Sequence, residues 1–250
     1  FLSGGVDSSI VVSAMGPDAQ TFSIGFFEDS YNESEWAAKV AGHLDVRHTV
    51  EMIEPDAATL FGELMHYMDD PIADFSIFPT YLVSRVARDQ VTVVLTGDGG
   101  DELFGGYETY AAQDVAERWS RVPSPLRSLA TVTADRLPPT PAKKGFVNKA
   151  KRFLEGVELS PELEHARWRL FADAELRDRL FVPDLRAEVS ASESHITELF
   201  QDAGERSALD RRLFVDMKSY LAENCLTKVD RMSMACSLEA RVPFLDHEVV

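Results

Sequence analysis

The feature that most constrains the fold of this sequence is the alternation of short apolar runs with helical patterns in its first half. Valine, isoleucine and phenylalanine gather at residues 21–26, 46–50 and 91–96, and polar residues or glycine follow each run. Helical patterns occupy residues 8–15, 33–44, 56–68 and 80–89. Strands that alternate with helices in this way predict an α/β fold with a parallel sheet and right-handed crossovers.

The second half of the chain has a different pattern. Five of the twelve prolines fall within residues 122–141, which separate the alternating half from the rest. Helical periodicity with almost no strand signal follows at residues 148–156, 161–172, 184–202 and 207–221. We therefore predict an α/β part at residues 1–121 and a mostly helical part at residues 122–250.

Composition narrows the classes of partner. The 250 residues are 45% hydrophobic, which is enough to bury a full core. Lys and Arg total 25 against 42 Asp and Glu, so the net charge of −17 disfavours nucleic acid and membrane surfaces as partners. The two cysteines lack metal-site spacing, and we find no secretory signal or long apolar run. These features favour a cytoplasmic location.

A glycine pair follows the apolar lead at the start of the chain. Ser3, Gly4 and Gly5 precede a predicted helix, and in a parallel sheet a ligand crevice lies at this end of a strand. The backbone at adjacent glycines can approach a phosphate, and hydroxyl groups and the helix dipole add attraction. Asp7 fits such a site if a cation lies between its carboxylate and the phosphate, which suggests Mg²⁺ with a nucleotide. The alternative is a tight turn with a helix cap and no ligand.

A second glycine cluster, TGDGGDELFGGY at residues 96–107, follows the predicted strand at 91–96. It combines five glycines with Asp98, Asp101 and Glu102, and matches neither a Walker A loop nor the dinucleotide fingerprint. Three carboxylates on one loop repel one another unless they serve a cation or a catalytic task. If this strand lies beside the first one, Asp7 and Asp101 would face each other as a shared Mg²⁺ site.

A third dense stretch, LTKVDRMSMACSLEARVPFLDH, covers residues 226–247. Lys228, Arg231 and Arg241 are the cations best placed to neutralise phosphates. A helical network of ion pairs with the neighbouring acidic residues is an equally good interpretation of the spacing.

Together these stretches resemble one family. SGGVDSS at residues 3–9 is similar to the loop of the ATP pyrophosphatase (PP-loop) superfamily. The second and third stretches, with FSIGF at 22–26 and DDPIADFSIFPTYLVS at 69–84, resemble the synthetase domain of glutamine-dependent asparagine synthetases. The resemblance covers most of the chain and is weakest between residues 122 and 207. It implies a parallel-sheet, adenine-nucleotide alpha-hydrolase-like (PP-loop) domain followed by a mostly helical half.

The resemblance also implies an activity. The family adenylates the side-chain carboxylate of aspartate with ATP, releases pyrophosphate, and lets ammonia attack the β-aspartyl-AMP to give asparagine. By this resemblance, ATP would be held by Leu2, Ser3, Gly4, Gly5, Asp7, Ser8, Ile24, Thr96 and Gly97. Asp7 and Asp101 would ligate Mg²⁺, and Lys228 would contact pyrophosphate. Asp98 would be catalytic, at a position where many relatives carry the longer Glu.

Family members carry an amino-terminal glutaminase domain that supplies the ammonia and uses a cysteine at its first position. Neither Cys225 nor Cys236 lies where such a nucleophile would be, so we expect this chain to be a synthetase domain trimmed at both ends. Two alternatives stay open: a related amide- or lactam-forming synthetase acting on another carboxylate, and a non-catalytic nucleotide-binding module. The sequence also leaves the oligomeric state open, a homodimer included.

Overall fold

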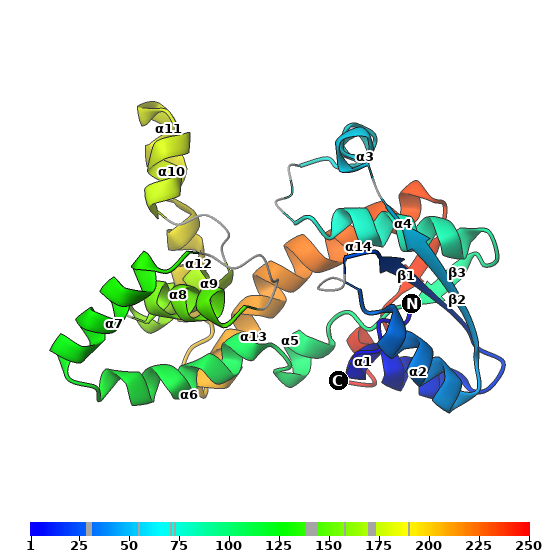
Figure 1. The fold of residues 1–250 in the computed structure, drawn as a ribbon, viewed down its shortest axis with the longest axis horizontal. Helices are drawn as coiled ribbons and strands as arrows, with labels where there is room; N and C mark the ends of the chain where they lie inside the picture. Colours follow the sequence, from blue (N-terminus) through cyan, green and yellow to red (C-terminus); the bar gives the residue numbers. More distant parts are fainter. Residues whose placement is uncertain are drawn as a thin grey trace. The chain divides into compact units, whose positions relative to one another are not determined.

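The computed structural model describes residues 1–28, 32–54, 56–70, 72, 74–138, 145–157, 159–169, 174–189 and 191–250. The fold is mixed α/β, mostly helical, with small parallel sheets, which confirms the coarse form of the prediction (Figure 1). The chain divides into two compact units. Unit 1 is residues 1–104 with 220–250, and unit 2 is residues 105–219. The boundary that we expected between residues 121 and 122, from an α/β part to a helical part, falls inside unit 2. It stays a prediction.

Two pairs of parallel strands form the sheet structure of unit 1. Strand β1 (Gln20–Phe26) pairs with β2 (Arg47–Ile53), and β3 (Val93–Leu95) pairs with β4 (Glu239–Arg241). The apolar lead lies between the pairs: the Leu2 N–H donates to the Phe22 carbonyl at 3.1 Å, and the Phe1 amino group donates to the Leu95 carbonyl at 2.6 Å. This confirms that the strand after residue 91 lies beside the lead. The mostly helical second half contains a three-residue strand, β4, that the sequence did not indicate.

Helices pack on both sides of β1 in unit 1. Their bounds are α1 (Val6–Met15), α2 (Ser34–Leu44), α3 (Ala57–Leu64), η2 (Met65–Tyr67), α4 (Ile77–Arg88), α5 (Gly100–Phe104), α14 (Thr227–Ala235) and η4 (Pro243–Leu245). In Figure 1, α4 and α14 lie above β1, and α1 and α2 lie below it. Two sets of buried side chains match these positions. The first joins Leu64, Ile77, Tyr81, Leu82 and Met232, and the second joins Leu2, Val12, Ala37 and Ala41.

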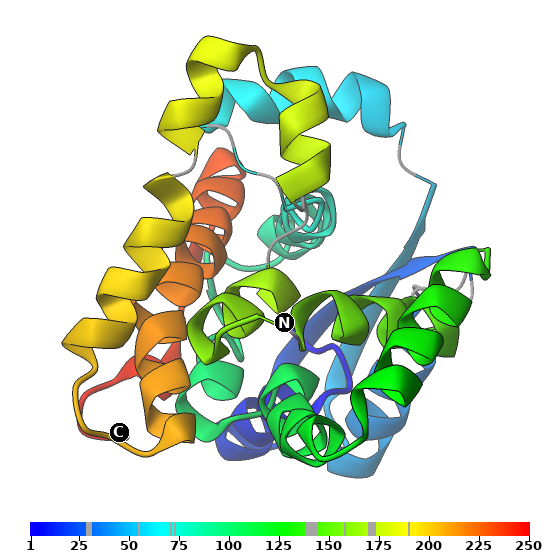
Figure 2. The same cartoon turned by 90° about the vertical axis from the view of Figure 1, so that its left-hand side faces the viewer.

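Unit 2 is helical in its described residues (Figure 2). Its helices are α6 (Glu108–Ser120), α7 (Ser124–Arg136), α8 (Phe146–Gly156), α9 (Pro161–Arg169), α10 (Ala174–Leu180), α11 (Pro183–Val189), α12 (Ala191–Asp202) and α13 (Ala208–Asp216). A π-helix, η3 (Met217–Leu226), follows α13 along the chain. The predicted helices 148–156, 161–172, 184–202 and 207–221 correspond to α8, α9, α11 with α12, and α13 with part of η3; residues 170–172 and 190 lie outside the described residues.

Helices α6 and α7 are absent from the prediction. Helix α7 occupies part of the proline-rich stretch that we interpreted as a boundary, whose residues 139–141 lie outside the described chain. Pro123 is the N-cap of α7 and Pro125 lies in its first turn, where a missing N–H breaks no intrahelical bond. Proline at these positions begins a helix. None of the helices among the described residues is both long and apolar enough to span a bilayer.

Candidate functional site

The first glycine loop (residues 3–8) is fixed by its own hydroxyl groups and by α2. Ser3 Oγ lies 3.0 Å from Ser8 Oγ, and the Ser3 N–H donates to that same Ser8 oxygen at 3.2 Å. Gly4 has a φ of +80°, and a Cβ added there would lie 2.6 Å from the backbone carbon of Trp36. Glycine is therefore required at position 4 both for its backbone angle and for the closeness of α2.

The same loop leads into the start of α1. Gly5 is the N-cap, and no side chain among the described residues caps this helix. The first turn of any α-helix presents N–H groups that have no intrahelical acceptor. These groups and the helix dipole favour an anion such as phosphate at this end of α1.

The second glycine loop (residues 96–106) lies against the first. A Cβ added at Gly97 would lie 2.9 Å from Ser8 N, and one added at Gly100 would lie 2.6 Å from Asp7 Cγ. The Asp7 carboxyl group therefore lies against the first residue of α5, the helix that also carries Asp101. The structure brings the two loops together, as the order of the strands led us to expect.

The predicted adenosine-binding residues lie near the junction of the strands. Leu2 is buried, and its carbonyl accepts from the Ser23 hydroxyl. Ile24 on β1 packs against two buried clusters, one that contains Leu82 and one that contains Val86. Thr96 is buried, and its hydroxyl has no partner in the part of the chain that the structure describes. A buried hydroxyl without a hydrogen bond lowers the stability of the fold. A bound molecule that hydrogen-bonds to the Thr96 hydroxyl would remove this penalty.

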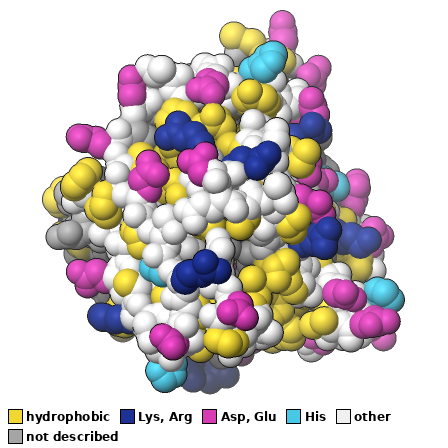
Figure 3. Space-filling model, turned by 90° about the vertical axis from the view of Figure 1, so that its right-hand side faces the viewer, with side chains coloured by type: hydrophobic (Ala, Val, Ile, Leu, Met, Phe, Trp, Pro, Cys, Tyr) yellow, Lys and Arg dark blue, Asp and Glu magenta, His cyan; other side chains and the backbone are white. Residues whose placement is uncertain are grey.

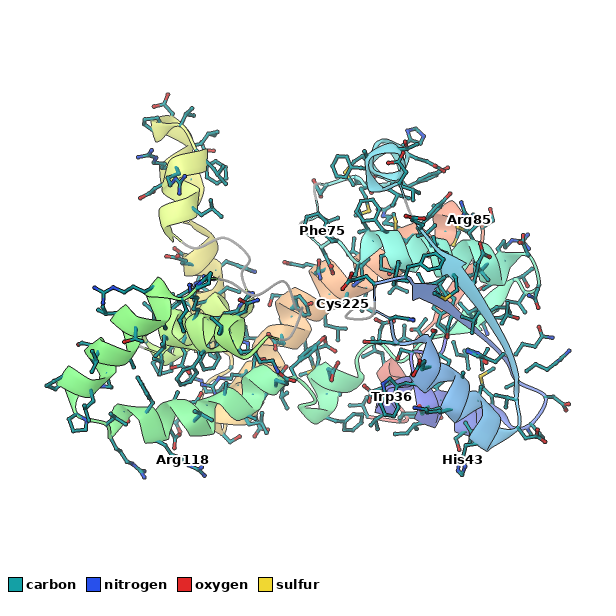
Figure 4. The ribbon with its side chains drawn as sticks, in the orientation of Figure 1. Trp36, His43, Phe75, Arg85, Arg118 and Cys225 are labelled. Carbon is teal, nitrogen blue, oxygen red and sulfur yellow. The ribbon has the colours of Figure 1, made fainter. Side chains whose placement is uncertain are left out.

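The two predicted catalytic residues lie around a buried thiol. Cys225 Sγ donates to Glu102 Oε1 at 3.9 Å. Burial raises the pKa of Cys225 to about 12; the positive charge of Lys228 opposes this shift, and the negative charges of Glu102, Asp98 and Asp74 add to it. Asp98 and Lys228 therefore both lie within electrostatic range of one desolvated position on η3. Figure 4 labels Cys225.

Lys228 is held by a group of residues that the sequence analysis missed. Its Nζ donates to Asp74 Oδ2 at 3.0 Å and to Ser76 Oγ at 2.7 Å, and Asn224 Nδ2 donates to the same Asp74 oxygen at 3.0 Å. Burial opposes ionisation of Asp74, but hydrogen bonds from Ser76 and the charge of Lys228 lower the pKa of Asp74 to about 2. Two signals were available in the sequence: Asp74 and Ser76 lie in the stretch 69–84 that resembles the family, and the pattern Asp-x-Ser ahead of a helix indicates a turn.

The other two cations of the third stretch are engaged elsewhere. Arg231 pairs with Asp69, and Arg241 Nε lies 2.7 Å from Glu239 Oε1, with all four side chains largely exposed. Both residues form ion pairs, but not the helical network that the spacing suggested: Asp69 lies outside the third stretch, and Arg241 lies on a strand. Acidic and basic side chains are interspersed over the face of the molecule drawn in Figure 3.

The chain is similar to a known family of proteins along its whole length. The family model described as Asparagine synthase matches residues 1–250. The chain is 32% identical to "Asparagine synthetase [glutamine-hydrolyzing] 1" of Bacillus subtilis, over 100% of this chain and 39% of that protein. It is 34% identical to "Putative asparagine synthetase [glutamine-hydrolyzing] 2" of Methanocaldococcus jannaschii, over 98% of this chain and 46% of that protein.

A more distant relative carries a different name. The chain is 25% identical to "Amidase chyE" of Penicillium rubens, over 100% of this chain and 41% of that protein. The chain thus spans less than half the length of each of these three relatives.

Proposed function

The chain belongs to the asparagine synthase family, and on this basis we propose that it is the synthetase part of an ATP-dependent carbon–nitrogen ligase that makes asparagine. In the proposed reaction, the side-chain carboxylate of aspartate attacks the α-phosphate of ATP and pyrophosphate leaves. Ammonia then displaces AMP from the β-aspartyl-AMP. The products are asparagine, AMP and pyrophosphate.

The observation that carries this proposal is the contact between the two glycine loops. The uncapped start of α1 supplies N–H groups for a phosphate, and Asp7 lies directly across from Gly100 at the start of α5. A PP-loop nucleotide fold would use this geometry to hold the phosphates of ATP, with the adenosine against the backbone of Leu2, Ile24 and Gly97.

The residues also fit a magnesium ion. No group of three or more His, Cys, Asp or Glu side chains within the described residues could bind a metal unaided. Mg²⁺ characteristically takes one or two carboxylates and completes its shell with water and substrate phosphates. Asp7 and Asp101 would supply that pair, and the ion would neutralise charge on the leaving pyrophosphate.

Asp98 and Lys228 are proposed to act on the reacting groups. Charge develops on pyrophosphate as it leaves, so a fixed ammonium at Lys228 would stabilise the transition state more than bound ATP. The side chain of Lys228 is only 11% exposed and Asp98 is partly buried, so both have limited contact with water. Exclusion of water protects an acyl-adenylate from hydrolysis.

The source of ammonia is proposed to lie outside the matched region. The relatives are named glutamine-hydrolysing, and this chain covers only part of their length. We therefore assign glutamine hydrolysis to a separate amino-terminal domain. A cytoplasmic location is part of the same proposal. A second candidate function is the same chemistry on a different carboxylate, and one relative of the chain has a name other than asparagine synthetase.

The decisive test supplies the full-length protein with Mg-ATP, ammonia and L-aspartate and identifies the nucleotide product. We expect AMP and pyrophosphate only when aspartate is present, and no product with Asp7→Ala. AMP without aspartate dependence would favour the second candidate. ADP as the product would contradict the proposal. Nucleotide binding without turnover would also contradict it, and would favour a non-catalytic nucleotide-binding module.

A further inference from the structure

Asp74 is a carboxylate near the proposed site whose two oxygens both accept hydrogen bonds. Its Oδ2 accepts from Lys228 at 3.0 Å and from Asn224 at 3.0 Å, and its Oδ1 accepts from the Ser76 N–H at 2.9 Å and the Ser76 hydroxyl at 2.7 Å. Four donors from two segments distant in sequence therefore hold one side chain. This number of bonds fixes the carboxylate and leaves it little freedom to act as a base.

Lys228 depends on this carboxylate. The side chain of Lys228 is only 11% exposed, and a paired carboxylate offsets the cost of removing its charge from water. Asp74 Oδ2 and Ser76 Oγ take two of its three N–H donors, which leaves one for a further acceptor. We expect this acceptor to be an anion. It would lie near Cys225, because the charges of both Lys228 and Asp98 act on that thiol.

We propose that Asp74 is a positioning residue that holds the ammonium group of Lys228 in place and aimed at the departing pyrophosphate. This assignment rests on the proposed function, because it takes pyrophosphate as the anion that Lys228 meets. Ser76, the N-cap of α4, accepts a second hydrogen bond from the same ammonium group. The turn that directs Asp74 and Ser76 to Lys228 leaves Phe75 between them 74% exposed, as labelled in Figure 4.

A neighbouring ion pair provides a matched control. Arg231 lies three residues after Lys228 on α14 and pairs with Asp69, five residues before Asp74. The two pairs join the same two segments, but Arg231 and Asp69 are 42% and 70% exposed. Removing the charge of Asp69 breaks an ion pair between the same two segments and leaves the hydrogen bonds of Lys228 in place.

The experiment is calorimetric titration of the full-length protein with inorganic pyrophosphate in the presence of MgCl₂. We expect Asp74→Asn to weaken pyrophosphate binding at least tenfold and Asp69→Asn to change it less than twofold. Lys228→Met should weaken binding by a similar factor to Asp74→Asn. The double variant with both changes should bind no more weakly than Lys228→Met, because Asp74 acts through that lysine.

Several outcomes would overturn the assignment. Wild-type affinity in Asp74→Asn, or additive losses in the double variant, would show that Asp74 does not act through Lys228. If Asp74→Asn does not fold, Ser76→Ala takes its place, with an expected loss of at least threefold; unchanged affinity would contradict the proposal. Failure of the wild-type protein to bind pyrophosphate would instead overturn the proposed function, and this assignment with it.

Discussion

Gly100 lies where the two glycine loops meet, and its lack of a side chain keeps Asp7 in place. A Cβ at this position would lie 2.6 Å from Asp7 Cγ and 2.8 Å from Asp7 Oδ1. The clash involves the end of a side chain that can rotate, so the fold can accommodate it. The cost falls on the position of the Asp7 carboxylate.

We therefore expect Gly100→Ala to lower kcat/KM for Mg-ATP at least tenfold with little change in the melting temperature. The comparison is Gly62→Ala, because Gly62 lies in α3 and an added Cβ there meets nothing within 4 Å. That variant should keep full activity and gain up to about 1 kcal/mol of stability from helix propensity. Equal activity in the two alanine variants would show that contact between the loops does not govern the site.

Asp74 also makes a pH-dependent contribution to stability. Its pKa is lowered from 3.8 to about 2 in the folded protein, so its contribution to stability is complete above about pH 4 and is lost as pH falls through 2. The shift corresponds to about 2 kcal/mol. Urea unfolding of the wild type and Asp74→Asn should differ by about this amount at pH 6. The difference should shrink steadily below pH 4, and a constant difference down to pH 2 would contradict the prediction.

At the scale of elements, the packing of α4 against α14 holds the segment that carries Lys228. Met232 on α14 is fully buried among Ile77, Tyr81 and Leu82 of α4. Met234, two residues further, is 55% exposed. The two methionines differ in burial and not in chemistry. Replacing each by alanine therefore measures how much the packing of Met232 contributes to the free energy of unfolding.

We expect Met232→Ala to lower the free energy of unfolding by about 2–4 kcal/mol, because it leaves a cavity between the two helices. Met234→Ala should change it by less than about 0.5 kcal/mol. Denaturant unfolding at neutral pH measures both variants. Similar losses for the two methionines would mean that α14 is not anchored through this cluster.

The sequence predicted the elements whose signal is local. Strands β1 and β2 each contain a run of β-branched or aromatic residues, and their observed bounds lie within a few residues of the predicted ones. Strand β4 has three residues, Glu239–Arg241, and exists because it pairs with β3, far away along the chain. No pattern within three residues can indicate such a pairing.

The same distinction separates the predicted and the missed site residues. Glycines at strand ends indicated both loops, and the structure brings these loops together. Asp74 was missed because its partner, Lys228, lies 154 residues away. An isolated aspartate in a turn has many ordinary uses, so its importance appears only when the fold supplies the cation.

At the scale of the whole molecule, all of the predicted site residues belong to unit 1. They come from residues 2–101 and from Lys228, whereas unit 2 spans residues 105–219. Unit 2 has a buried cluster of its own, in which Tyr110 Oη donates to Asp216 Oδ2 at 2.5 Å and His165 Nε2 lies 2.8 Å from Asp216 Oδ1. Each unit thus has buried side chains of its own.

We therefore predict that unit 1 folds and binds Mg-ATP when a Gly/Ser linker of about ten residues replaces residues 105–219. The two parts of unit 1 meet near the cut, since Cys225 Sγ lies 3.9 Å from Glu102 Oε1, and a flexible linker of that length spans about 17 Å. Calorimetric affinity should stay within tenfold of the full chain and disappear in the same protein with Asp7→Ala. A folded unit 1 without affinity would mean that unit 2 supplies part of the nucleotide site, a role that none of the sequence motifs indicates.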